Sequence, residues 1–222
     1  MRGIPIFTRH GARLAPLAIF SMAMAMAMTM LSVGCASQDP AGIRIAVDAG
    51  GKGTMTIAAL TAPAVATVQP TASKGVKWTD GVQLTITAGD FESIDDVAFE
   101  DLIVDAADFT ADSGTVRIVI PRGDDARWYR ALHVSAKQRA AMQKALERAI
   151  QKVELNENLT IAVEMTGAEV AANLVQTVPG VGVSAKRGVA TIVIPMDVLE
   201  KSGAPMVLAI NWERPGMTAS RP

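Results

Sequence analysis

The chain has 222 residues, a single cysteine and almost balanced charge, with 21 basic and 22 acidic side chains. Near-neutral charge argues against general binding to nucleic acid or other polyanions. Aromatic residues make up 4% of the sequence, which leaves little ring surface for stacking on sugars or bases.

Residues 1–34 have the pattern of a secretory signal peptide. Arg2, Arg9 and Arg13 precede an uncharged, largely apolar stretch that runs to Gly34, and small and polar residues follow it. Cationic flanks stay on the cytoplasmic side while an apolar segment enters the membrane. The stretch also reaches about 20 residues, the length of a spanning helix. A retained membrane anchor is therefore the alternative to cleavage.

The sequence LSVGC, residues 31–35, resembles the lipobox of bacterial lipoproteins. In that class a small residue precedes a cysteine that is acylated and becomes the new N-terminus. Gly34 and Cys35 match this pattern, whereas Ser32 stands where the class prefers a large aliphatic residue. The resemblance implies a lipid-anchored protein of the bacterial cell envelope, at the outer membrane or the periplasmic face, with the membrane as its partner through lipidated Cys35.

Ordinary cleavage near Ala36 or Ser37 is the alternative, and it would give a soluble secreted or periplasmic protein. An exported chain with one cysteine cannot form an internal disulfide, and a free thiol is unusual outside the cell. Acylation of Cys35 would account for that cysteine.

After a short tether at 35–42, the next segment is predicted to be β. Residues 43–60 alternate on both sides of a glycine-rich turn, which predicts a β-hairpin. Residues 61–75 contain two prolines and many small residues and predict a loop or linker. Two more strands are expected around Asp80-Gly81, so hairpins and loop together occupy residues 43–88.

Two later segments share a sequence pattern. FTADSGTVRIVIP at 109–121 resembles VSAKRGVATIVIP at 183–195, and LTI occurs upstream of both at nearly the same spacing. Gly114 and Gly188 are expected at two-strand turns. A helix is expected before each hairpin, at 93–104 and 167–178.

The predicted fold class is therefore α+β, with β-hairpins followed by two β-α-β-β units at 84–121 and 159–214, the second including a final strand. Chance repetition of apolar strand ends is the alternative to duplication. A connecting region at 122–158 contains an amphipathic helix that begins with a Ser135–Gln138 capping box. Residues 215–222 form a tail. The apolar positions of this helix are Met142, Ala145, Leu146, Ala149, Ile150 and Val153.

No catalytic residue, metal site or cofactor is predicted. His133 is the only histidine after the leader, and the glycine-rich segments at 49–54 and 180–185 lack the motif spacing or element order of nucleotide-binding loops. Residues 89–114 carry many carboxylates, which can bind calcium or act as acid and base, although a solvated face explains them more simply. These acids are Asp90, Glu92, Asp95, Asp96, Glu100, Asp101, Asp105, Asp108 and Asp112.

The candidate ligand-binding residues are Arg127, Trp128, Tyr129 and Arg130. Basic side chains interleaved with aromatic ones can bind glycans or anionic ligands. In the alternative interpretation, the rings of Trp128 and Tyr129 pack a helix against the core, and the arginines face the acidic segment.

The sequence thus predicts an exported, lipid-anchored envelope protein that acts as a non-catalytic binding or assembly module, with a protein partner or as a homo-oligomer. An exported hydrolase that uses Asp and Glu carboxylates is one alternative, and a module that binds glycans or anionic ligands is another.

Overall fold

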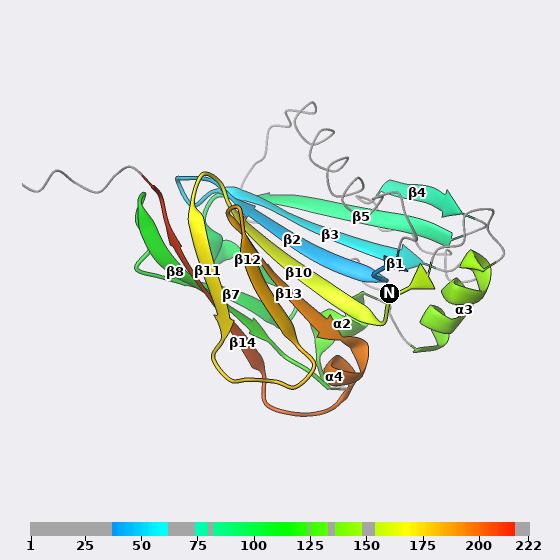
Figure 1. Ribbon diagram of the computed structural model, residues 1–222. Helices are drawn as coiled ribbons and strands as arrows, with labels where there is room; N and C mark the ends of the chain where they lie inside the picture. Colours follow the sequence, from blue (N-terminus) through cyan, green and yellow to red (C-terminus); the bar gives the residue numbers. More distant parts are fainter. Residues whose placement is uncertain are drawn as a thin grey trace, which may run out of the picture.

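The computed structural model describes residues 37–61, 74–79, 82–123, 125–132, 136–147 and 154–215. Two β-sheets pack face to face, and short helices lie at one end (Figure 1). The body is therefore mostly β with some helix, which is broadly compatible with the predicted α+β class. Cys35 and the leader lie outside the described residues.

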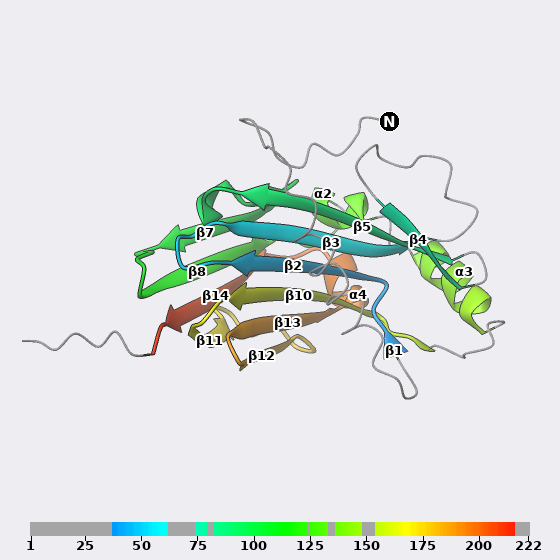
Figure 2. The ribbon, with the colours of Figure 1, turned by 90° about the horizontal axis from the view of Figure 1, so that it is seen from above.

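The larger sheet has seven strands, and β2 and β10 form its parallel pair while the other neighbours run antiparallel. Figure 2 shows β3, β2, β10, β13 and β12 side by side. Every second side chain of β10 is buried, as expected for a strand with one face on a core. In spatial order the strands are β12 (Gly182–Lys186), β13 (Val189–Pro195), β10 (Asn158–Met165), β2 (Ala41–Val47), β3 (Gly53–Thr61), β5 (Val82–Phe91) and β4 (Lys74–Thr79).

The smaller sheet has five strands, all antiparallel. Along β14, Met206, Leu208, Ile210 and Trp212 are buried, and the residues between them face outward. These inner side chains pack with those of the larger sheet in one core cluster. In spatial order the strands are β11 (Glu169–Leu174), β14 (Met206–Glu213), β8 (Ser113–Ile120), β7 (Leu102–Ala107) and β6 (Ala98–Phe99).

The helices lie where the two sheets diverge (Figure 1). Trp128 of α2 (Arg127–Ala131) is fully buried, and its indole N–H donates to the carbonyl of Pro121 at 2.7 Å. α4 (Met196–Glu200) adds Met196 and Leu199 to the same core. α3 (Ala136–Leu146) lies beyond them, beside the small parallel pair of β1 (Ser37–Gln38) and β9 (Glu154–Leu155).

The two predicted helices at 93–104 and 167–178 are wrong. The first region contains a single 3₁₀ turn, η2 (Ile94–Asp96), followed by the hairpin of β6 and β7. Ser93 does cap that turn, since its hydroxyl accepts from the Asp95 N–H, but Glu100 then takes a left-handed φ of 57° and reverses the chain. The second region is β11, which pairs with β14 over its whole length. Strand pairing overrides local helix preference in both places, with the next strands along the chain in the first region and with the distant β14 in the second.

The proposed duplication is unconfirmed. Ile118–Ile120 lies in β8 of the five-stranded sheet, whereas Ile192–Ile194 lies in β13 of the seven-stranded sheet. Gly188 occupies the predicted turn with a φ of 77°, but Gly114 lies inside β8 and not at a turn. The β-α-β-β description is therefore wrong for both segments.

Other boundaries are confirmed or shifted. The hairpin at 43–60 is confirmed as β2 and β3, with a turn at 48–52. The tether ends earlier than predicted, because residues 37–38 form β1 and residues 41–42 belong to β2. Lys74 and Gly75 belong to β4 and not to the loop. Residues 62–73, Asp80-Gly81, Ser135, residues 148–153 and the tail from 216 onward lie outside the described residues.

Candidate binding face

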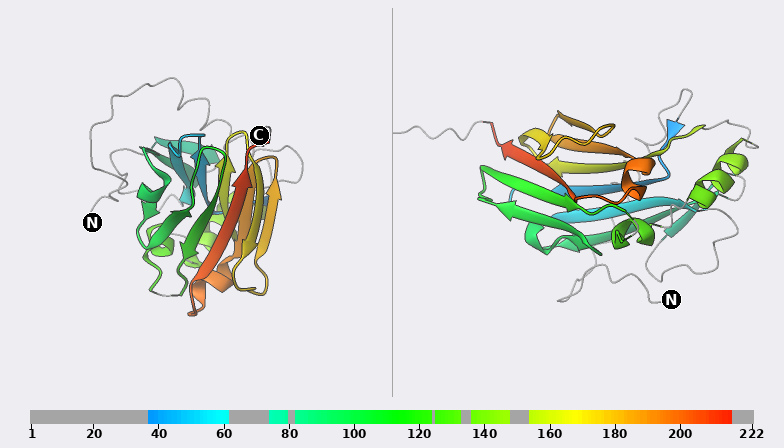
Figure 3. Two further views of the ribbon diagram at one scale, coloured as in Figure 1. Left: turned by 90° about the vertical axis from the view of Figure 1, so that its left-hand side faces the viewer. Right: turned by 90° about the horizontal axis from the view of Figure 1, so that it is seen from below.

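The face of the five-stranded sheet that points away from the core is called the outer face here. Strand register arranges its side chains in rows that cross β7, β8, β14 and β11. Figure 3 shows this sheet at the end of the molecule opposite α3. Because the residues between the buried positions of each strand point to the other side, the outer face can be assigned residue by residue.

One row of the outer face is entirely apolar. Ile103 of β7 stands opposite Val119 of β8, and Val119 stands opposite Val207 of β14. The row continues to Val175, whose N–H donates to the Val207 carbonyl at 2.9 Å. Ile103 is 51% exposed and Val175 is 59% exposed, and they are the exposed large hydrophobic residues of the described part of the chain. The row of Ile103, Val119, Val207 and Val175 is called the apolar row below.

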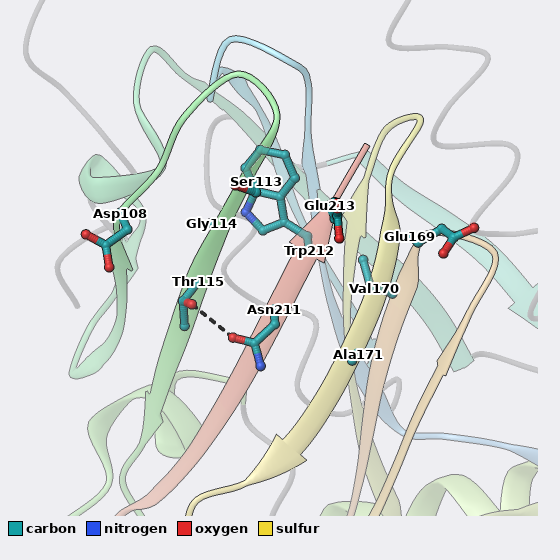
Figure 4. A pocket seen from close by; sticks show the side chains of 10 residues that line it. All are labelled: Asp108, Ser113, Gly114, Thr115, Glu169, Val170, Ala171, Asn211, Trp212 and Glu213. Atoms are coloured by element: carbon teal, nitrogen blue, oxygen red, sulfur yellow. Dashed lines mark hydrogen bonds between the residues drawn. The ribbon is translucent and has the colours of Figure 1, made fainter. Parts of the chain in front are cut away.

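The next two rows are more polar. Arg117 of β8 stands between Asp105 of β7 and Ala209 of β14. One row further on, the Thr115 hydroxyl donates to the Asn211 side-chain oxygen at 2.9 Å (Figure 4). The face therefore changes from apolar to polar along the strands, away from the helices.

A shallow hollow of about 510 Å³ lies at the polar end of the outer face (Figure 4). Its carboxylates come from Asp108, Glu169 and Glu213, and within the described residues none of the three forms an ion pair. Glu169 and Glu213 stand directly opposite each other on β11 and β14, an arrangement of like charges that destabilises a sheet. The other lining residues are Ser113, Gly114, Thr115, Val170, Ala171, Asn211 and Trp212.

A buried tryptophan lies beneath this end of the sheet. Trp212 is 3% exposed, its ring centroid is 5.0 Å from that of Phe109, and the Arg214 guanidinium lies 4.8 Å from the indole centroid. The indole nitrogen lies against Gly114, where an added Cβ would be 2.9 Å from it. Close approach of this ring therefore requires glycine at position 114.

The predicted ligand-binding residues do not form a stacking surface. Trp128 is fully buried and Tyr129 is 8% exposed, so a glycan cannot reach either ring, while Arg127 and Arg130 remain exposed. The N–H groups of Arg127 and Trp128 donate to the Asp101 carboxylate at 3.0 and 2.8 Å. The packing alternative agrees with this burial, and the contact to the acidic segment is made by the helix backbone.

Tyr129 belongs to a polar cluster that joins the three helices. Its hydroxyl donates to Glu200 of α4 at 2.9 Å, and Arg139 of α3 donates to both the hydroxyl oxygen and Glu200. Burial, together with the hydrogen bond to Glu200, raises the pKa of Tyr129 to about 12. The Arg139 side chain is only 12% exposed, so this basic residue of α3 forms an inter-helix contact.

The acidic side chains of residues 89–114 make separate structural contacts and do not form one site. Asp90 accepts from the Thr54 hydroxyl, Glu92 pairs with Lys52, and Asp95 accepts from the Ala106 N–H. Of the nine acids only Asp108 lines the hollow. Sequence reasoning missed Glu169 and Glu213, because only the pairing of β11 with β14 brings them together.

The described residues contain no group of three or more His, Cys, Asp or Glu side chains arranged to hold a metal ion. None of the helices in the described ranges has the length and apolar character needed to cross a membrane. No protein-family model, curated protein or solved structure matches the chain.

Proposed function

We propose that this protein is an exported, lipid-anchored component of the bacterial cell envelope that acts as a non-catalytic binding or assembly module. The basic and apolar leader and the lipobox-like LSVGC sequence support export and anchoring at Cys35. The outer face of the five-stranded sheet supports binding.

The apolar row is the observation that carries the binding proposal. Its two end residues, Ile103 and Val175, are each more than half exposed. Isolated apolar residues on a surface need no explanation, but four β-branched side chains in one row across four strands form a contiguous strip. Exposed contiguous apolar surface that is bordered by polar residues marks sites of protein association.

The hollow indicates the chemistry of the partner. Its three carboxylates, which form no ion pair with any described residue, favour cationic side chains, and electrostatic complementarity of this kind sets partner choice. The apolar row and the hollow are separated by three row steps, or about 20 Å at the rise of an antiparallel strand. A protein partner that presents apolar side chains and, about 20 Å away, lysines or arginines fits both ends of the face.

Photocrosslinking in the cell envelope tests this proposal. A photoreactive residue replaces Ala209, which is half-buried at the centre of the outer face, and in a matched control it replaces Ala162, equally half-buried on the outward side of β10. We expect an adduct with another protein from position 209 and not from position 162. The adduct should be lost in the Ile103→Ser/Val175→Ser double variant and weakened in Glu169→Lys.

Equal adducts from both positions, or no adduct from position 209, would contradict the binding proposal. An adduct between two copies of the chain would assign the outer face to self-association and contradict a cationic protein partner. An adduct unchanged by Glu169→Lys would contradict the role given to the hollow.

A further inference from the structure

The described body begins very close to the proposed anchor. Only Ala36 separates Cys35 from Ser37, the first residue of β1. Consecutive Cα atoms are at most 3.8 Å apart, so the Cys35 Cα lies within about 8 Å of the Ser37 Cα. An acyl chain on Cys35 would therefore hold β1 close to the bilayer surface.

β1 is attached firmly to the rest of the molecule. It pairs in parallel with β9, where Ser37 stands opposite Glu154. Directly after it, the Asp39 carboxylate accepts from the Asn156 side-chain amide at 3.0 Å and from the Thr160 hydroxyl. Because these contacts tie the start of the body to β9 and β10, an anchor at Cys35 would constrain the orientation of the whole sandwich.

α3 lies beside this attachment point and is basic on its exposed side. Gln143 of α3 accepts from the Leu155 N–H of β9 at 2.9 Å, and Met142 is fully buried. Lys137 and Lys144 are exposed, and because they are seven residues apart they lie on the same side of the helix.

Two exposed alanines, Ala140 and Ala141, lie between the lysines, and α3 itself contains no acid. Glu147, also exposed, follows the helix, and Glu157, exposed just after β9, adds a second carboxylate, so the described exposed charges of this end are two lysines and two acids. Lysines close to an anionic bilayer surface are attracted to its headgroups, so Lys137 and Lys144 can contact anionic headgroups when an anchor at Cys35 holds α3 near the bilayer.

We infer that the end of the sandwich formed by β1, β9 and α3 rests on the bilayer, with Lys137 and Lys144 at anionic lipid headgroups. This inference rests on the proposed lipid anchor at Cys35. It directs the outer face of the five-stranded sheet away from the membrane, because that sheet occupies the opposite end of the molecule (Figures 1 and 3). The seven residues of β2 place the far end of the sandwich about 20 Å beyond the anchor end.

Fluorescence quenching with the acylated, mature protein in vesicles tests the orientation. A single cysteine is introduced by Ala140→Cys on α3 or, as the matched control, by Ala171→Cys in the hollow, and each is labelled with a fluorophore. Both alanines are exposed. The vesicles contain phosphatidylglycerol and phosphatidylethanolamine with a quencher on the headgroup. We expect strong quenching of the label at position 140 and little at position 171.

Equal quenching at the two positions, or stronger quenching at position 171, would overturn the orientation while leaving the anchor intact. The intact mass of the same sample separates the two ideas, since a protein without acyl chains would overturn the anchor and the orientation together. Lys137→Glu/Lys144→Glu should reduce quenching at position 140 in these vesicles and not in vesicles of phosphatidylcholine. An unchanged signal in the anionic vesicles would overturn the role of the lysines.

Discussion

Tyr129 allows a direct test of the cluster that joins α2, α3 and α4. It is the only tyrosine in the chain, so the ultraviolet absorbance of tyrosinate reports this residue alone. Burial disfavours the charged phenolate, and the hydrogen bond to Glu200 stabilises the neutral hydroxyl. Together they raise the pKa of Tyr129 from an ordinary value of 10.0 to about 12, although the nearby Arg139 opposes the shift.

The shift has a calculable effect on stability. Since the fold favours the neutral hydroxyl, the stabilisation is fully present below pH 10 and is lost as the pH rises through 12. A difference of about two pKa units corresponds to at most about 2.7 kcal/mol of unfolding free energy. The unfolded chain releases its proton first in this interval, so stability falls with increasing pH.

The assay combines an absorbance titration with urea unfolding. We expect a tyrosinate midpoint near 12 in the folded protein and near 10 in urea. Between about pH 9 and about pH 12 the wild type should lose up to about 2.3 kcal/mol more stability than Tyr129→Phe, which keeps the ring but cannot ionise. A folded-state midpoint near that of the unfolded chain, or equal losses in both proteins, would refute this description of the cluster.

Three further predictions concern the N-terminus of α2 and the packing and charge of the smaller sheet. Asp101→Ala removes the acceptor for the first N–H groups of α2 and should lower the unfolding free energy by about 1–2 kcal/mol in urea titrations, with Asp101→Asn intermediate. Gly114→Ala should cost about 1–3 kcal/mol more than Gly182→Ala in the same assay, because an added methyl group meets the buried indole at position 114 and nothing within 4 Å at position 182. Glu169→Gln should raise Tm at low salt by removing repulsion from Glu213, and the gain should shrink at high salt; a lower Tm would contradict this reading of the hollow.

Local sequence patterns predict those parts of the fold that depend on alternation. The final strand within 159–214 is an example, since alternate residues of β14 are buried. The hairpin at 43–60 is also predicted correctly, although β2 is buried on both faces. The burial of Trp128 agrees with the packing alternative for the aromatic residues after the acidic segment.

The mispredicted helices and the binding face depend on strand pairing instead, and for β11 and the binding face that pairing is long-range. Between residues 93 and 104, Ser93 caps a single 3₁₀ turn, which provides the local signal of a helix start. The turn at Glu100 then alters the spacing between buried residues. The sequence of the two short strands therefore resembles that of a helix. The apolar row combines residues 103, 119, 175 and 207, which only the register of four strands brings together. No local pattern contains that information.

The intact mass of the mature protein from the membrane fraction tests the central claim most directly. The proposed function predicts a chain that begins at Cys35 and carries acyl chains. A chain that begins unmodified near Ser37 or Gln38, or one that retains residues 1–34, would contradict a lipid-anchored module.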